Sequence, residues 1–206
     1  MRILFFDTET NGLPHVRKAP VRLVENWPRI VQIAWQIVDI TETSCFPQPI
    51  LSHILRQDPT STWDAGSERI HGISKERTET EGRLGKDVCA EFVEDALHAD
   101  VIVAHNLEFD KPVVLAECIR NGLGVDWWPT KEFCTMKHTT PLLKLPTKYS
   151  KPHDPYKYPS LKEMAHYLFG TTESFAFHTA GGDVECVVKC FLELLRRRVL
   201  DLESLR

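Results

Sequence analysis

Two short runs of the chain are wholly apolar, and they constrain the fold more than any other feature of the sequence. They cover residues 3–6 and 101–104. Strands that are apolar on both faces are typical of sheets covered by helices on both sides. A membrane span needs about 20 apolar residues, so neither run is expected to cross a membrane. We therefore predict an α/β fold with a central sheet.

The remaining apolar pattern extends this architecture. Strands are predicted over residues 2–6, 30–40 and 50–55, and their short connections favour an antiparallel meander. Apolar residues at helical spacing predict helices around residues 89–97 and 184–199. Two more helices are predicted. One begins at Asp110, with Pro112 in its first turn, and stops at Gly122, and the other runs from the N-cap Ser160 to about residue 168.

The length and charge of the chain set further limits. We expect a single domain, residues 1–206. Acidic residues follow the first apolar run at once, so no export signal is expected, and the protein is predicted to be cytoplasmic with reduced cysteines. The net charge of −4 gives no overall basic field of the kind that marks many nucleic-acid binders. The formal net charge leaves out bound metal ions, so it underestimates the positive charge of a chain whose acids bind metals.

Acidic residues stand where predicted strands end or helices begin. Asp7 and Glu9 follow the first strand, Asp110 follows residues 101–104, and Asp183 precedes the final helix. If the extended backbone continues through Glu9, the first two carboxylates point to the same side. Open α/β sheets bind ligands at such an edge. Each acid alone is better explained by a helix cap or a solvated surface, and the metal site is predicted from the set as a whole.

Four carboxylates in one site would raise each other's pKa, and a pair of divalent cations removes this conflict. Oxygen ligands of this kind suit Mg²⁺ or Mn²⁺. Two such ions, roughly 3.5–4 Å apart, are a standard arrangement for displacement at phosphorus. His178, five residues before Asp183, is a candidate to take the proton of the attacking water. The set therefore predicts metal-dependent attack of water on phosphorus.

Taken together, the acidic segments resemble the DEDD exonuclease superfamily, histidine subtype, the DnaQ-like group. The three matching segments are residues 5–13 (FFDTETNGL), 104–110 (AHNLEFD) and 178–183 (HTAGGD), the last with the H-x-x-x-x-D spacing of the histidine subtype. Residues 70–74 (IHGIS) and 159–170 resemble other recurring segments of the family. The resemblance covers nearly the whole chain.

The resemblance implies a ribonuclease-H-like fold with a five-stranded mixed sheet flanked by helices. It implies that Asp7, Glu9, Asp110 and Asp183 hold two divalent metal ions, Mg²⁺ or Mn²⁺, and that His178 is the general base. The expected reaction is hydrolysis of the terminal phosphodiester at single-stranded or frayed 3′ ends of DNA, which releases nucleoside 5′-monophosphates.

Several alternatives stay open. RNA 3′-end trimming and degradation of short oligonucleotides use the same chemistry. A non-catalytic fold that binds nucleic acid or a partner protein would be expected to lack one or more of the carboxylates, and none is missing. Association with a polymerase or repair complex and a homodimer are both compatible with the sequence. No membrane partner is expected.

Seven further positions are predicted to contact the substrate. Leu13 would wedge beside the terminal base, and a turn anchored in the core explains this leucine equally well. Ile73 would line the pocket for the terminal nucleotide, as part of residues 70–73. The other predicted positions are Thr10, Asn106, Phe109, Lys148 and Lys157. By contrast, His71 and His105 are expected to be structural, and Trp127 and Trp128 to serve packing.

Two segments are interpreted as elaborations of the family fold, near residues 15–29 and 144–160. Residues 144–162 contain five lysines, three tyrosines and four prolines, but one acid. Long loops within a compact domain are usually functional or mobile. Aromatic residues interleaved with cations suit contacts with a nucleic-acid strand, and a solvated proline-rich loop is the alternative.

Overall fold

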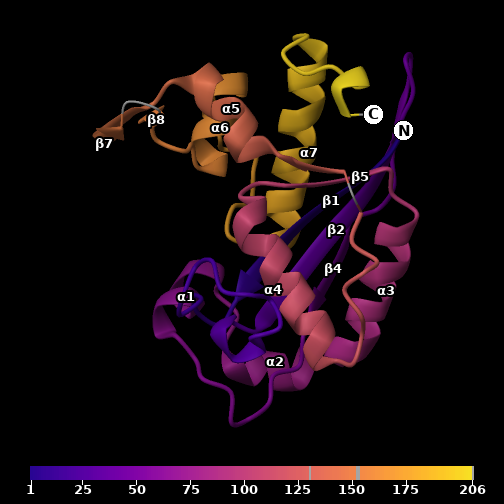
Figure 1. Cartoon of the computed structure of the whole chain (residues 1–206), viewed down its shortest axis with the longest axis vertical. Helices are drawn as coiled ribbons and strands as arrows, with labels where there is room; N and C mark the ends of the chain where they lie inside the picture. The colour runs from indigo at the N-terminus through magenta and orange to yellow at the C-terminus, as the bar shows by residue number, and fades with distance from the viewer. Residues whose placement is uncertain (130, 152–153, 206) are drawn as a thin grey trace.

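The fold is known from a computed structural model that describes all residues except 130, 152–153 and 206, and only the backbone of residues 148–151 and 154. A mixed sheet of six strands forms its centre (Figure 1). The strands are β1 (Arg2–Thr10), β2 (Ile30–Ile40), β3 (Cys45–Pro47), β4 (Leu51–Ile54), β5 (Val101–Ala104) and β6 (Glu132–Cys134).

The order across the sheet is β3-β2-β1-β5-β6, and β4 also pairs with β2. β1 pairs antiparallel with β2 and parallel with β5, so the sheet is mixed. β3 and β4 pair antiparallel with successive stretches of β2. They share one position beside that strand, so the sheet is five positions wide. The predicted meander and mixed sheet are therefore confirmed, with one position divided between two short strands.

Helices cover both faces of this sheet (Figure 1). They are α1 (Ala65–His71), α2 (Lys75–Glu81), α3 (Gly85–Leu97), α4 (Leu107–Arg120), α5 (Thr135–Leu143), α6 (Leu161–Phe169) and α7 (Ala180–Arg196). Short 3₁₀ helices span Val24–Asn26 and Glu203–Leu205, and β7 (Pro146–Lys151) and β8 (Asp154–Tyr156) form a separate two-stranded sheet. Among the described residues, no helix is long and apolar enough to cross a bilayer.

Side-chain alternation along β1 divides the core into two layers. Ile3 and Phe5 pack on the side of α6 and α7, whereas Leu4 and Phe6 pack on the side of α3 and α4. The Phe5 ring lies edge-to-face with Phe191 of α7 at a centroid distance of 5.0 Å. Odd-numbered residues at the end of β1 therefore face α7, and even-numbered residues face α4.

The starts of two predicted helices need correction. α4 begins at Leu107, after Asn106 in the left-handed conformation (φ 71°), so Pro112 lies inside the helix and not in its first turn. Asp110 is therefore not the N-cap.

The final helix also begins earlier than predicted. α7 starts at Ala180 because the hydroxyl of Thr179 accepts the N–H of Gly182 and caps the helix there. The two glycines are consequently part of the first turn, and Asp183 closes that turn. The helix predicted from Ser160 is confirmed, with a capping box formed by Ser160 and Glu163.

A buried carboxylate on α4 fixes the segment at residues 15–29. The side chain of Glu117 is 1% exposed and accepts hydrogen bonds from Arg29 Nη2 at 2.8 Å and from Arg120 Nη1 at 2.9 Å. Arg120 also donates to the main-chain carbonyls of Val24 and Trp27, each at 2.5 Å. The segment is therefore held against α4 by a charged network and not only by apolar packing.

We predict that Glu117→Ala lowers the free energy of unfolding by about 3–5 kcal/mol, because it leaves two partly buried guanidinium groups without their counter-charge. Urea denaturation measures this change. Glu94→Ala, which removes an exposed carboxylate from α3, is the matched control and is expected to stay within about 0.5 kcal/mol of the wild type. Equal effects of the two substitutions would contradict a stabilising role for the network.

Candidate active site

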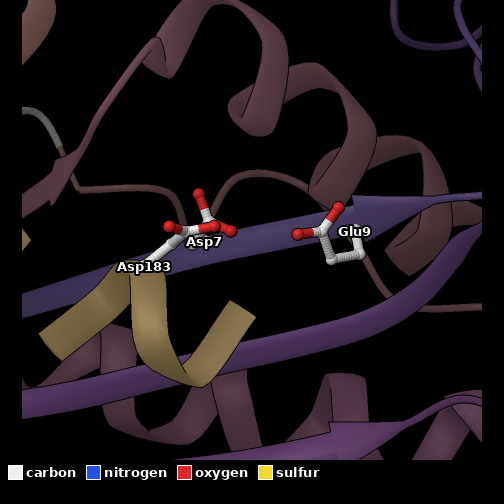
Figure 2. Close-up of side chains that lie close together, drawn as sticks. All are labelled: Asp7, Glu9 and Asp183. Atoms are coloured by element: carbon white, nitrogen blue, oxygen red, sulfur yellow. The ribbon is translucent and has the colours of Figure 1, made fainter. Parts of the chain in front are cut away.

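Three carboxylates meet at the end of β1. Asp7 and Glu9 lie two residues apart on the strand and face α7, whose first turn carries Asp183 (Figure 2). One oxygen from each of the three lies within 4.8 Å of the others. The strand extends to Thr10, so the backbone is extended through Glu9 and the side chains of Asp7 and Glu9 lie on the same side of the sheet.

The fourth predicted acid, Asp110, reaches the same strand end from the opposite face. Its carboxylate is 3% exposed and accepts a hydrogen bond from the Thr8 hydroxyl at 2.7 Å. Thr8 is even-numbered and therefore points toward α4, between the two acids that point toward α7. Sequence reasoning missed Thr8, although the same alternation that pairs Asp7 with Glu9 places it on the α4 side.

The electrostatics of the site follow from burial and from like charges. Burial, and then the neighbouring carboxylates, raise the pKa of Asp7 well above its usual range and that of Glu9 to about 7. Burial raises the pKa of Asp110 to about 7, although the bond from Thr8 opposes this rise. The pKa of Asp183 is about 6, again chiefly through burial. Several buried oxygen donors that repel one another fit divalent cations such as Mg²⁺ or Mn²⁺.

His178 precedes this cluster in a strained turn. It is exposed and has a left-handed backbone (φ 66°), and its N–H donates to Asp183 Oδ2 at 3.1 Å. The hydrogen bond from the His178 N–H, and then the electrostatic interaction with that residue, lower the pKa of Asp183, which partly offsets the effect of burial. The main chain therefore ties the predicted base to one of the predicted metal ligands.

The turn after β1 is rigid and presents an apolar side chain. Asn11 is buried, accepts the N–H of Arg29 at 2.8 Å and donates to the carbonyl of Thr62 at 2.7 Å. Leu13 lies two residues further on and is 77% exposed. Leu13 is thus not anchored in the core, and it is free to contact a ligand.

The other predicted substrate positions differ in accessibility. Ile73 is 3% exposed, whereas Ile70, in the same segment, is 59% exposed, so the segment offers Ile70 to a ligand. Thr10 is buried and its hydroxyl donates to the carbonyl of Gly12, and Phe109 packs against the α3–α4 layer. Asn106 forms no side-chain cap on α4, and Lys157 pairs with Glu163 at 2.6 Å. Lys148 lies in β7, and its side chain is outside the described part of the chain.

The residues interpreted as structural have structural contacts. His105 lies between the Thr135 hydroxyl and the Pro159 carbonyl, each at 3.0 Å, and burial lowers its pKa to about 4. His71 is buried and accepts the N–H of Ile73 at 3.1 Å. The rings of Trp127 and Trp128 pack edge-to-face on Phe92 and Phe6, which confirms their role in packing.

Comparison with known families decides the classification. The model of an exonuclease family, described as "Exonuclease" and named RNase_T, matches residues 4–191. The chain belongs to this exonuclease family. The resemblance to DEDD exonucleases drawn from the three motifs is thereby confirmed, and with it the prediction of an exonuclease enzyme. Membership in this exonuclease family also implies divalent metal ions.

Solved structures of exonucleases share the fold. E. coli exonuclease I in complex with a dT13 oligonucleotide is 18% identical, with a TM-score of 0.72 over 96% of this chain and 41% of that chain. The zinc-ion-bound form of an E. coli exonuclease I–ssDNA complex is 17% identical, with a TM-score of 0.70 over 96% of this chain and 41% of that chain.

Exonuclease I of Methylocaldum szegediense is 16% identical, with a TM-score of 0.66 over 96% of this chain and 40% of that chain. The exonuclease domain described here thus spans about two fifths of these relatives. The predicted ribonuclease-H-like fold is confirmed. No curated protein matches the chain.

We predict that Gly182→Ala strongly reduces nuclease activity, whereas Gly181→Ala does not. A Cβ atom at Gly182 would lie 1.9 Å from the carbonyl oxygen of Ala176, so the turn that carries His178 would have to move. At Gly181 the nearest side chain is Ser52 at 3.6 Å, an ordinary contact. A loss of at least about tenfold in kcat for the first variant alone is expected, measured on a labelled oligonucleotide. Equal activity of both variants would show that the turn tolerates displacement.

A second prediction concerns stability in EDTA. A carboxyl whose pKa is raised by folding contributes stability below its unfolded pKa, near 4, and this contribution is lost as the pH rises through the folded value. We therefore expect Asp7→Asn to be more stable than the wild type, with a gap that widens as the pH rises above about 4, because the pKa of Asp7 is raised well above its usual range. Thermal or urea unfolding measures the gap.

Buried His105 has a lowered pKa, so its contribution to stability changes with pH in the opposite direction. Both proteins contain His105, and its contribution therefore cancels in the difference between them. Mn²⁺ should stabilise the wild type increasingly over the same pH range and have little effect on Asp7→Asn. A gap that is constant with pH would contradict the raised pKa of Asp7 in the folded state.

Proposed function

We propose that the chain is a metal-dependent 3′-to-5′ exonuclease that removes nucleoside 5′-monophosphates from single-stranded 3′ ends of DNA. The observation that carries this proposal is the convergence of Asp7, Glu9 and Asp183, with Asp110 reaching the same strand end through Thr8. Buried acids of raised pKa are unfavourable for stability and are typical of catalytic centres. Membership in the exonuclease family supports the same reaction class.

The four carboxylates would hold two divalent metal ions. When bound, such ions activate the attacking water and stabilise charge on the leaving oxygen. The chain's own contribution is to fix the ligands from two directions, β1 and α7 on one face and α4 on the other. The Thr8 hydroxyl keeps one oxygen of Asp110 engaged and so fixes this carboxylate beside β1.

His178 is proposed as the general base. Its main-chain bond to Asp183 keeps it beside the carboxylates, and its exposure allows a proton taken from water to pass on to solvent. A positioned histidine contributes typically about 10²–10⁴-fold to such a step.

Leu13 and Ile70 are proposed to contact the terminal nucleotide. Both are large apolar side chains that the fold leaves exposed, at 77% and 59%. Each is held by a buried neighbour in its own segment, Asn11 for the first and Ile73 for the second. Ile73 would therefore act on the substrate through the position of its segment and not by direct contact.

DNA is proposed as the substrate, in view of the similar fold of exonuclease I bound to oligonucleotides such as dT13. The direct test uses 5′-labelled single-stranded DNA and RNA of the same sequence, each with Mn²⁺, Mg²⁺ or EDTA. We expect a ladder that shortens from the 3′ end, needs the metal and forms faster on DNA. Asp7→Ala should abolish the ladder, because the cluster loses the carboxylate that interacts electrostatically with all three others.

His178→Ala in the same assay should lower kcat by about 10²-fold or more with little change in KM. Circular dichroism confirms that each variant is folded. A faster ladder on RNA would assign the enzyme to RNA 3′-end trimming. An unchanged rate for Asp7→Ala would refute the proposed active site.

A further inference from the structure

An apolar groove lies beside α5 and α6, on the side of the second, two-stranded sheet. It encloses about 740 Å³. Its lining includes Met136, Leu143, Leu145, Tyr158, Pro159 and Tyr167. The active-site geometry described above uses none of these side chains. Figure 1 shows β7 and β8 projecting outward from α5 and α6 at this end of the molecule.

The groove adjoins the segment that carries Asp110. His105, the residue before the α4 N-cap, is hydrogen-bonded to the carbonyl of Pro159, which lines the groove, and to Thr135, which precedes the lining residue Met136. A second link joins the first turn of α4 to α5, because Lys137 pairs with Glu108 at 2.5 Å. Hydrogen bonds and an ion pair thus tie the walls of the groove to the segment in which α4 begins.

The lining has the chemistry of a single-strand binding surface. Tyr158 and Tyr167 are half-exposed, at 48% and 47%, and offer ring faces on which bases can stack. Lys162 is exposed and forms no ion pair among the described residues, so its charge is available to a phosphate. Lys157 also lines the groove but pairs with the lining residue Glu163 at 2.6 Å, so Lys162 supplies the excess positive charge of the described lining. This local excess of positive charge complements a nucleic-acid backbone.

We propose that this groove binds the part of a single strand that lies upstream of the 3′ end being hydrolysed. Bases stack on Tyr158 and Tyr167, and a phosphate lies at Lys162. The proposal rests on the proposed function, because it takes the carboxylate cluster as the position of the 3′ end. It predicts that the chain prefers long strands to short ones. Because the contacts are base stacking and phosphate charge, the preference should not depend on base sequence.

The test separates the groove from the catalytic centre by substrate length. Oligodeoxythymidylates of about 3–12 nucleotides probe both, and the p-nitrophenyl ester of thymidine 5′-monophosphate probes the centre alone. The wild type should show a KM that falls with length. The double variant Tyr158→Ala/Tyr167→Ala should raise KM on the longest strand by at least about 25-fold, since each stacked base contributes about 1 kcal/mol or more. Its rate on the ester should match the wild type.

Matched variants control for folding and for nonspecific effects. Tyr158→Phe/Tyr167→Phe keeps both rings and should retain the wild-type KM. Phe46→Ala removes a ring that is 61% exposed on β3, at the other edge of the central sheet. It should change neither the KM for the long strand nor the rate on the ester. Lys162→Gln should reduce the slope of log KM against log salt concentration by about 0.7, the value for one phosphate contact on a single strand.

Anisotropy of a labelled dT12 strand in EDTA repeats the comparison without hydrolysis, so the groove can be judged even if the chain proves inactive. Loss of affinity in the alanine variant, with retention in the phenylalanine variant, is the expected result. An unchanged KM and affinity in the alanine variant would overturn the proposal and leave the groove to a polypeptide partner. Failure of the wild type to hydrolyse the ester with Mn²⁺ would instead count against the proposed function.

Discussion

Burial of four carboxylates at the end of one strand, where Asp7 and Glu9 are also repelled by their neighbours, is the constraint on which the rest of the structure depends. Asp7, Glu9, Asp110 and Asp183 all have raised pKa values, and burial is the first cause for each. Such a cluster opposes folding, so the surrounding structure has to compensate for it. Two of the acids lie in the first turns of α4 and α7, where the partial positive charge of a helix N-terminus favours a carboxylate. Hydrogen bonds from Thr8 and from the N–H of His178 add to this compensation.

The position of β1 makes this convergence possible. The strand lies between β2 and β5, and both of its faces are covered, by α7 on one side and α4 on the other. Its alternating side chains therefore meet acids that come from two different helices. A sheet with one solvated face would bring carboxylates from one side only. The two apolar layers are thus the support that holds the acids together, in addition to being the core.

The sequence predicted the parts of this arrangement that depend on short-range pattern. Strand period accounts for β1 and for the shared direction of Asp7 and Glu9, and the capping box at Ser160 is a local signal that the structure confirms. The starts of α4 and α7 were predicted too late. Asn106 adopts a left-handed conformation that asparagine tolerates but does not require, and Thr179 was not recognised as a cap.

Other features depend on tertiary contacts that no local pattern encodes. Ile70 and Ile73 are chemically equivalent in the sequence, yet one is exposed and the other buried. Helices α1 and α2 have seven residues each, too few for a reliable apolar period, and they escaped prediction. The bond between Thr8 and Asp110 spans 102 positions, so it becomes visible only once α4 is placed against β1.

α4 connects the cluster of buried acids to the surfaces around it. Asp110 in its first turn faces the end of β1, Glu117 near its end anchors residues 15–29, and Glu108 pairs with Lys137 of α5. His105, just before the helix, holds Pro159 at the groove beside α6. Residues 15–29 and the groove are therefore both tied to the element that carries Asp110. A strand bound in the groove, as proposed, would be positioned relative to Asp110 through these contacts.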